Sequence, residues 1–498
     1  MDLLNNLIFG FGVAVTLQNL AYCFLGVLVG TLIGVLPGIG PLATIAMLLP
    51  LTFNVAPVGA LIMLAGIYYG AQYGGSTTAI LVNLPGETSS VVTCIDGYQM
   101  ARQGRAGPAL AIAAYGSFFA GTVGTLLIAL AGPPLAEIAL KFGAPEYFSL
   151  MLMGLVAAAV LAQGDMLKSL AMVAIGLLLG IVGTDVNTGV HRYTFDVHEL
   201  ADGIGFIVIA VGVFAIGEIV SNLGNPERRE IFVSKVSHLF PTRDDLKQSA
   251  GPIVRGTALG SFFGVLPGTG PAIASFASYM LEKKLAADPS RFGRGAIEGV
   301  AAPEAANNAD AQCKFIPMLT LGLPASGVMA LMLGALTIQG IQPGPQVMTQ
   351  RPELFWGLVA SMWVGNLMLV ILNLPLIGIW VKLLKVPYRL LFPAIMAFSA
   401  IGIYSVNNSS FEIYLTALFG IFGFIFVKLG FPPAPMLLGF VLGPMMEENL
   451  RRAMLMSKGD PSVFVERPIS LAFIVATVLI LIVMIAPAVR RRHAEIAD

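Results

Sequence analysis

Long apolar stretches recur through this chain from Leu7 to Val489, and each runs for about the 20 residues that a helix needs to cross a bilayer. Only 11% of the 498 residues are charged, whereas roughly 25% are charged in an average soluble domain, so soluble domains of this length would lack the charge to cover their surfaces. An outer-membrane barrel would instead show alternating segments of about ten residues. We therefore expect an all-α polytopic membrane protein with about 11–13 membrane segments in the lipid bilayer.

The distribution of charge predicts the orientation of the chain. The 28 basic and 28 acidic residues balance, which argues against a nucleic-acid partner because such a partner requires a basic surface. The longest polar stretch, residues 222–251, contains five Lys and Arg residues, and the positive-inside rule places it in the cytoplasm. Arg490, Arg491 and Arg492 place the C-terminus there too. The first basic residue is Arg102, which permits an N-terminus outside.

The two halves of the chain are related in sequence. Residues 30–41 (GTLIGVLPGIGP) and 260–271 (GSFFGVLPGTGP) are identical at 8 of 12 positions, at an offset of 230. Later landmarks correspond in the same order: Pro85 with Pro324, Gly121 with Gly365, and Pro145 with Pro387. With the N-terminus outside and the middle loop inside, the first half crosses an odd number of times, which predicts two inverted repeats. We expect a first repeat over 1–222, a cytoplasmic linker over 223–251, a second repeat over 252–446, and a polar loop, final helix and basic tail over 447–498.

The repeated PGxGP motif predicts a break within a membrane segment. Proline removes a backbone donor and glycine tolerates open conformations, so the motif interrupts a helix. Paired interruptions at matching positions of two repeats indicate the substrate site of a secondary transporter. A structural kink for helix packing is the alternative. The candidate substrate-binding residues here are Pro37, Gly38, Gly40, Pro267, Gly268, Thr269 and Gly270.

A second polar segment, residues 68–90 (YYGAQYGGSTTAILVNLPGETSS), predicts a re-entrant hairpin or a broken helix. Hydroxyls stand at its start and backbone amides at its tip, and such amides suit the recognition of carboxylates. Alternatively, the hydroxyls bond back to their own helix. The candidates are Gly75, Ser76, Thr77, Thr78, Asn83 and Gly86.

The counterpart in the second half is residues 298–327, which bring Glu304, Asn307 and Asn308 toward the membrane. Ionisable groups within spans are costly and usually functional. Asparagine carbonyls could coordinate Na⁺ and their amides a carboxylate, while Glu304 could equally pair with Arg291 or Arg294. The candidates for coupling a cation are Ser76, Asn83, Glu87, Glu304, Asn308 and Asp310.

These segments resemble a known family. GVLPGIGP, YYGAQYGGSTTAILVNLPGE, DGYQMARQGRAG, GVLPGTGP, AAPEAANNA and LTLGLPASG are similar to the large membrane subunit (TctA) of the bacterial tripartite tricarboxylate transporters. The resemblance implies an elevator-like secondary carrier in the bacterial inner membrane that takes up tri- or dicarboxylates such as citrate. It implies two partners, a small four-helix membrane subunit and a periplasmic substrate-binding protein. It implies no cofactor beyond a coupling ion, Na⁺ or H⁺.

The second half departs from the family pattern at one place. Where the family has Gly-Gly-Ser, this chain has Gln312-Cys313-Lys314, and Ala325-Ser326 follows Pro324 where the family has Gly-Ser. Lys314 either pairs with Asp310, four residues earlier on the same helical face, or replaces a bound cation, or meets a substrate carboxylate. Lys314 and Ser326 therefore join the candidate substrate-binding residues.

Two other classes of protein remain as alternatives. One is an intramembrane enzyme acting on a lipid or polyprenyl substrate, and the other is a channel. The sequence contains no GxSxG, P-loop, HExxH or Rossmann motif, and it shows no cluster of catalytic side chains at membrane depth. We therefore expect a carrier rather than an enzyme.

Overall fold

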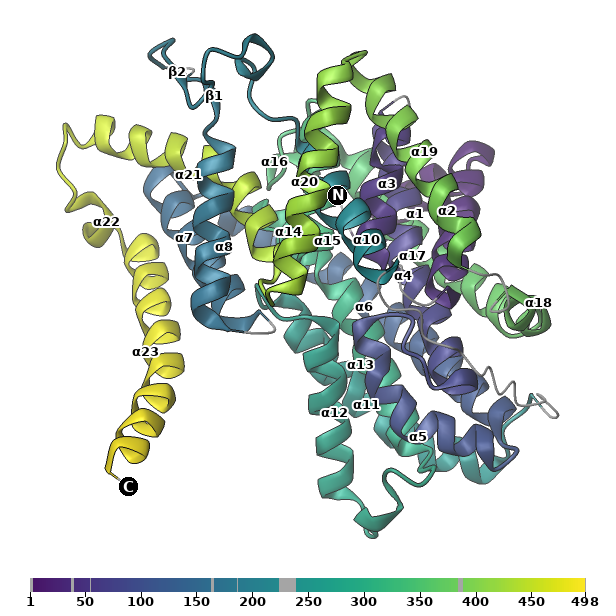
Figure 1. Cartoon of the computed structure of the whole chain (residues 1–498). Coiled ribbons are helices and arrows are strands. Elements are labelled where there is room, and N and C mark those ends of the chain that lie inside the picture. Colours follow the sequence, from purple (N-terminus) through teal and green to yellow (C-terminus); the bar gives the residue numbers. More distant parts are fainter. Residues whose placement is uncertain are drawn as a thin grey trace.

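The computed structural model describes residues 3–36, 40–53, 55–162, 165–185, 187–223, 239–383 and 388–497, and these are almost entirely helical (Figure 1). Up to the middle of the chain the helices are α1 (Leu3–Ala14), α2 (Leu17–Val35), α3 (Pro41–Thr52), α4 (Pro57–Val82), η1 (Thr88–Ser90), α5 (Val91–Arg102), α6 (Ala106–Ala139), α7 (Ala144–Leu161), α8 (Met166–Gly180), η2 (His198–Leu200), α9 (Phe206–Ile209), η3 (Ala210–Ile216) and α10 (Gly217–Leu223). The last three run on as one helix, in which η3 is a π-helical segment.

The second half of the chain is also almost entirely helical. Its helices are α11 (Arg243–Val265), α12 (Pro271–Leu285), η4 (Pro289–Arg291), α13 (Glu298–Cys313), α14 (Phe315–Leu321), α15 (Gly327–Ile338), α16 (Gln346–Gln350), α17 (Pro352–Asn373), α18 (Ile377–Leu383), α19 (Tyr388–Asn407), α20 (Ser410–Lys428), α21 (Pro433–Met456), α22 (Val463–Glu466) and α23 (Pro468–Ala497). Two short strands, β1 (Gly183–Thr184) and β2 (His191–Arg192), form an antiparallel hairpin.

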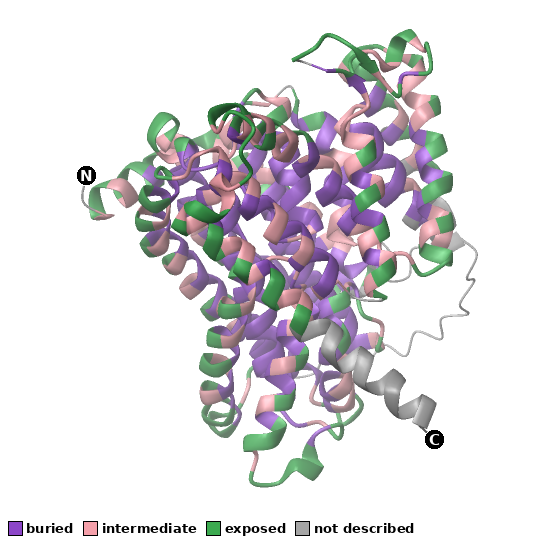
Figure 2. Ribbon diagram, turned by 90° about the vertical axis from the view of Figure 1, so that its left-hand side faces the viewer, coloured by how far each residue is buried: buried purple, intermediate pink, exposed green. Residues whose placement is uncertain are grey.

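The apolar helices make this a multi-pass membrane protein. Five described helices are long and apolar enough to cross a membrane, namely α2, α6, α7, α17 and α20, and shorter apolar helices such as α3, α8 and α15 accompany them. Buried residues run through the centre of the bundle and exposed ones lie on its outer faces (Figure 2). Large apolar side chains are among the exposed ones, including Phe262 (62% exposed) and Ile421 (57%). Such an outward apolar surface suits lipid. The number of spans stays a prediction.

Close helix pairs in the two halves are built in the same way. Glycines spaced four residues apart on α2 face the backbone of α4, and glycines on α11 face the backbone of α13. A Cβ on Gly30 would lie 2.4 Å from the carbonyl oxygen of Ile67, and one on Gly260 would lie 2.1 Å from that of Ala306. The equivalent contacts are Gly26 with Met63, Gly34 with Ala71, Gly256 with Ala302, and Gly264 with Asp310. Glycine is needed at these positions because any side chain would separate the two backbones.

The core is assembled from both halves. Helix α13 of the second half packs along α6 of the first, and α17 packs along α4. Tyr73 of α4 donates a 2.7 Å hydrogen bond to Asn366 of α17, and Asn308 of α13 donates one of 2.7 Å to Ser117 of α6. Polar residues near the middle of each half therefore meet residues of the other half.

A buried carboxylate fastens α5 to the turn that precedes α13. One oxygen of Asp96 accepts hydrogen bonds from the backbone N–H groups of Gly293 (2.9 Å), Gly295 (2.7 Å) and Ala296 (2.8 Å). The hydroxyl of Tyr279 donates to the other oxygen at 2.9 Å. Gly293 and Gly295 adopt positive φ values of 85° and 101°, which point successive amides at one anion.

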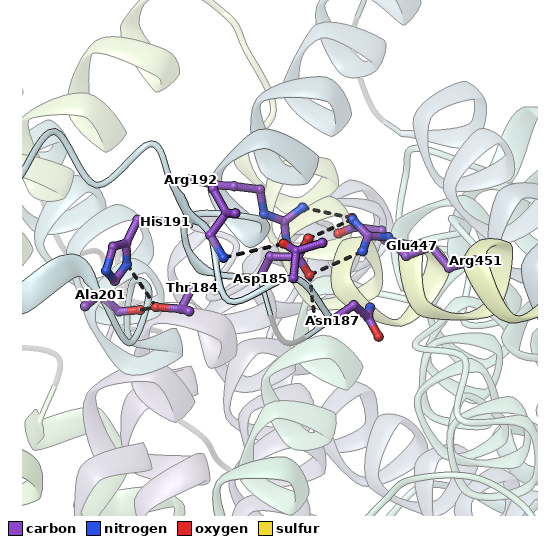
Figure 3. A network of polar contacts seen from close by, with 10 residues as sticks. Thr184, Asp185, Asn187, His191, Arg192, Ala201, Glu447 and Arg451 are labelled. Carbon is purple, nitrogen blue, oxygen red and sulfur yellow. Dashed lines mark hydrogen bonds and ion pairs between the residues drawn. The ribbon is translucent and has the colours of Figure 1, made fainter.

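An ion-pair network joins the β1–β2 hairpin to the end of α21 (Figure 3). Arg451 lies 3.0 Å from Asp185 and 2.7 Å from Glu447, and Arg192 lies 2.8 Å from Glu447. His191 in the same hairpin lies 3.1 Å from the hydroxyl of Thr184. The hairpin and the end of α21 therefore share one end of the molecule, opposite the turn that follows α12 (Figure 1).

The residues expected as a cytoplasmic linker, 223–251, lie partly outside the described residues. The described remainder includes the start of α11, which begins at Arg243 within the expected linker. The hydroxyl of Thr242 accepts from the backbone N–H of Asp245 at 3.1 Å, and the Asp245 carboxylate accepts from the backbone N–H of Thr242 at 3.0 Å. This reciprocal cap explains why a polar stretch already forms helix.

Candidate functional site

Each PGxGP motif interrupts a helix in the structure. Helix α2 ends at Val35 and α3 begins at Pro41, while α11 ends at Val265 and α12 begins at Pro271. Pro37 and Gly38 lie outside the described residues, and Gly40 caps α3 in an extended conformation. The break predicted at both motifs is therefore present among the described residues.

The second break is held by backbone contacts. Gly268 has a positive φ of 82°, and its N–H donates to the carbonyl of Ala325 at 3.0 Å. The hydroxyl of Thr269 lies within hydrogen-bond distance of two carbonyls at the end of α11, those of Phe263 (2.5 Å) and Leu266 (2.8 Å). Pro267 precedes these contacts, and Gly270 caps α12 in an extended conformation. The break is thereby joined to the turn at Ala325.

The two LP turns repeat one local structure. Asn83 directly follows α4 and Gly322 directly follows α14, and both of these residues are left-handed, with φ values of 56° and 68°. Asparagine and glycine are the residues that tolerate this conformation best. Past the turn, Glu87 caps η1, and Ser326 caps α15 by accepting from the N–H of Met329 at 3.4 Å. Both segments are helix–turn–helix structures.

These breaks and turns line two adjoining cavities, which we call the cleft. One has a volume of about 510 Å³ and the other about 540 Å³. Both are lined by Leu42, Thr88, Ser326, Gly327 and Ala434. The first is also lined by Gly40, Pro41, Tyr68, Gln72, Gly86 and Glu87, and the second by Gly268, Thr269, Gly270 and Ala325.

Four helix N-termini face the cleft. They belong to α3 at Gly40, to α12 at Gly270, to α15 at Ser326, and to η1 with α5 at Glu87. The first N–H groups of a helix have no partner within the helix and carry the positive end of its dipole. The cleft is therefore a site that favours an anion, and its volume suits a small organic molecule.

Side chains add polar groups to the first cavity. Ser89 lies 3.1 Å from the Oε1 of Gln72 and also contacts the carboxylate of Glu87. Asn307 donates to Glu87 at 3.3 Å. Gln72 Nε2 and Asn307 Oδ1 are buried without a hydrogen-bond partner among the described residues. Such unpaired groups are rare in proteins and mark positions where a ligand can bond.

The Ser76–Thr78 cluster does not line the cleft. Thr78 donates to the carbonyl of Gly74 at 3.2 Å, and Thr77 to that of Tyr73 at 3.4 Å, so both bond back to their own helix. The hydroxyl of Ser76 lies 2.9 Å from the carbonyl of Gln72 on its own helix and 2.5 Å from the carboxylate of Glu304 on α13. The small residue Gly75 leaves space for Glu87, whose side chain would lie 3.0 Å from an added Cβ.

Glu304 is buried among hydroxyls rather than basic residues. Ser76 contacts one carboxylate oxygen and Thr93 of α5 the other. Arg291, considered as a partner from the sequence, pairs instead with Glu298 at 3.2 Å. Asn308 lies one turn further along α13, where it also donates to the carbonyl of Glu304 at 3.1 Å.

The structure also places Lys314 and Asn83, two further candidates from the sequence. Lys314 forms an ion pair with Asp310, and both side chains are fully buried. The second oxygen of Asp310 has no partner among the described residues. Asn83 is exposed and directly follows the last residue of α4.

Sequence reasoning missed Gln72, Thr93, Ser117 and Asn373. Gln72 precedes Ser76 by one helical turn, a spacing that could have placed it on the same face of α4. The other three lie on helices far away in sequence and carry no motif. Among the described residues, no group of three or more His, Cys, Asp or Glu side chains is arranged to hold a metal ion.

Comparisons with known proteins agree with the resemblance. The chain is 59% identical over 496 residues to an uncharacterised 52.8 kDa protein in the TAR-I ttuC' 3' region of Agrobacterium vitis, covering 100% of this chain and 99% of the relative. It is 56% identical over 237 residues to an uncharacterised protein in the TAR-II ttuC' 3' region of that organism, covering 48% of this chain and 98% of the relative. No solved structure matches. The model of the tripartite tricarboxylate transporter TctA family matches residues 20–438, which confirms the resemblance, and the chain belongs to this family.

Proposed function

We propose that this chain is the large membrane subunit of a binding-protein-dependent transporter that takes up organic anions across the bacterial inner membrane. The substrates are tri- or dicarboxylates such as citrate, and uptake is coupled to the entry of Na⁺ or H⁺. Membership of a transporter family supports this proposal and fits a protein that is not an enzyme.

The convergence of four helix N-termini on the cleft is the observation that carries the proposal. A carboxylate in the cleft would accept hydrogen bonds from backbone N–H groups at these helix N-termini. The Nε2 of Gln72, which has no hydrogen-bond partner among the described residues, adds a further donor. The carboxyl side chain of Glu87 lies in the same wall, and a carboxylate there carries a negative charge in its ionised form. Glu87 would repel an anion unless a cation or proton accompanied it, which supports coupled transport.

The duplicated construction supports an elevator-like mechanism with inverted repeats. The glycine contacts of α2 and α11 are separated by the same 230 positions as the two PGxGP motifs. The left-handed residues Asn83 and Gly322 correspond within the two LP turns, since each stands two residues before the proline, Pro85 or Pro324. In the proposed mechanism the helices that carry the cleft move together, and they expose it alternately to the two sides of the membrane.

The two ends of the molecule support an assignment of sides and partners. The end with the turn after α12 carries Lys283, Lys284, Arg291 and Arg294, and the positive-inside rule favours the cytoplasm for it. The β1–β2 hairpin and the end of α21 then face the periplasm, where a substrate-binding protein would deliver the anion. Tripartite transporters work with partner subunits, and we propose a small four-helix membrane subunit as the third component.

Reconstitution tests the proposal. The chain is placed in liposomes with its small membrane partner, and uptake of radiolabelled citrate and other di- and tricarboxylates is measured under an inward Na⁺ or proton gradient. Uptake is expected only when the binding protein and a gradient are both present. Uptake of the anion down its own gradient without any cation requirement would contradict coupling, and chemical conversion of the substrate would contradict a carrier.

A further inference from the structure

A second, much smaller cavity lies apart from the cleft, where α4, α6 and the end of α17 meet. Its free volume of about 10 Å³ accommodates a single water-sized species. Its lining combines apolar residues such as Leu110, Ala113 and Leu374 with polar ones. The cavity therefore has room for one small ion but not for an organic substrate.

The polar residues that line the cavity are mostly hydroxyl-bearing. Hydroxyl groups are supplied by Tyr73, Ser76, Thr77 and Ser117, and an amide by Asn373. Asn373 uses its Nδ2 to donate to the carbonyl of Leu369 at 2.9 Å, whereas its Oδ1 is buried without a hydrogen-bond partner among the described residues. A buried oxygen without a donor is costly, and a cation in the cavity would satisfy it.

A carboxyl group without a basic partner among the described residues stands beside Ser76. Glu304 is fully buried, and its oxygens contact the hydroxyls of Ser76 and Thr93. Among the described residues, no Lys, Arg or His forms an ion pair with it, whereas the nearby Asp310 has Lys314. An isolated carboxylate is expensive to bury, and a cation held next to Ser76 would compensate its charge.

We propose that this cavity binds one monovalent cation of the size of Na⁺. Hydroxyl and amide oxygens of Ser76, Thr77, Ser117 and Asn373 are its ligands, and Glu304 supplies the compensating charge. Oxygen donors are the ligands that hard cations prefer. This inference rests on the proposed function, because it assigns the cation that accompanies the anion to a defined place.

The cavity is connected to the cleft through two helices. On α4, Ser76 contacts the backbone carbonyl of Gln72 at 2.9 Å, and the side chain of Gln72 lines the cleft. On α13, Glu304 lies one turn before Asn307, which donates to Glu87 in the wall of the cleft. A cation that fixes Ser76 and Glu304 would therefore also order the groups that face the anion.

Direct binding of ²²Na⁺ to the purified full-length chain tests the site without any transport. We expect saturable binding of one ion, and thermal stabilisation by Na⁺ that equal concentrations of K⁺ or choline do not give. Thr77→Val keeps the shape of the side chain and removes the hydroxyl oxygen. Asn373→Leu removes Oδ1, the buried amide oxygen that has no hydrogen-bond partner among the described residues. Each is expected to lower the Na⁺ affinity by roughly tenfold or more. Glu304→Gln should reduce it at least as much.

Glu353→Gln, on the surface of α17, is the matched control and should bind Na⁺ like the unchanged chain. If Glu304→Gln does not fold, Thr77→Val and Asn373→Leu still decide the question. Unaltered Na⁺ affinity in these two variants would overturn the proposal, as would stabilisation that depends on pH but not on Na⁺. Na⁺ binding without any carboxylate uptake would refute the proposed function and leave the cation site standing. Uptake that needs no Na⁺ would refute the cation site alone.

Discussion

Ser76 of α4 donates a 2.5 Å hydrogen bond to Glu304 of α13, and both side chains are buried. The pair joins the two sequence halves at a point between the cleft and the small cavity. Thr93 of α5 contacts the other oxygen of Glu304, so three helices share one carboxylate. Glu304 therefore belongs to the contacts that hold the first half against α13, whatever ion accompanies it.

Gly268→Ala is expected to abolish anion uptake while the protein still inserts. The residue has a positive φ of 82°, and a Cβ would lie 2.5 Å from the Cα of Ala158, so both the backbone and the wall of the cleft must move. Gly270→Ala is the control, because a Cβ there meets nothing within 4 Å and Gly270 has an ordinary φ of −97°. Uptake is measured in the reconstituted transporter. Equal uptake by the two variants would show that the shape at Gly268 is unimportant.

A double-substitution cycle measures the buried ion pair of Asp310 and Lys314. Either Lys314→Met or Asp310→Asn alone leaves one group unpaired in the interior and should destabilise the protein by about 3–5 kcal/mol. The double variant should recover much of this loss, because it buries no unpaired charge. Thermal unfolding in detergent gives the stabilities. If the two losses simply add, the residues do not act as a pair.

A different substitution at the same position tests whether Lys314 replaces a cation. If the lysine stands in for a bound ion, Lys314→Ser should make uptake more dependent on Na⁺ than in the unchanged chain. Na⁺ dependence is measured as the gradient requirement of uptake in liposomes. An unchanged uptake rate with unchanged ion dependence would leave Lys314 as a structural partner of Asp310.

Asp96→Asn should destabilise the packing of α5 against the turn before α13. The carboxylate accepts three backbone hydrogen bonds, and loss of its charge should cost about 2–4 kcal/mol. Tyr279→Phe removes one donor from the same carboxylate and should cost about 1 kcal/mol. Thermal unfolding gives both values. Equal losses for the two variants would contradict a leading role for the backbone amides.

Acid should release the β1–β2 hairpin from α21. The pKa of Asp185 is lowered to about 2, first because the backbone N–H of Asn187 donates to its carboxylate. Burial opposes this effect, while the hydroxyl of Thr188 and the guanidinium of Arg451 add to it. Because the pKa is depressed in the folded state, the stabilisation is complete above the ordinary pKa of about 4 and is lost as the pH falls toward 2.

Hydrogen exchange of residues 187–205 measures this release. Protection of the hairpin should fall between about pH 4 and pH 2, and Asp185→Asn should lower protection already at neutral pH. Asp196→Asn changes an exposed carboxylate in the same loop and serves as the control. A pH profile that is identical in the Asp185 variant and the unchanged chain would show that another group controls the loop.

Local chemistry made the breaks and turns predictable from the sequence. Proline and glycine dictate the interruptions at Gly40 and Gly268, and the family resemblance follows from the same motifs. It was harder to predict which neighbouring helix each face of a helix contacts. On α4, Gln72 and Ser76 are one turn apart. Gln72 lines the cleft, whereas Ser76 contacts Glu304, because α13 and α5 cover α4 at Ser76. The partners of Asp96 and Asn373 come from distant segments and left no local signal.

The glycine contacts have a consequence for how the two halves diverged. Because the glycines of α2 and α11 touch main-chain atoms, the spacing of each helix pair does not depend on the side chain opposite. Ala71 faces Gly34 in one half, and Asp310 faces Gly264 at the equivalent point of the other. One copy could thus gain a charged pair with Lys314 while the other kept small residues. The backbone contacts thus allow different side chains at equivalent points of the two halves without a change in the spacing of the helices.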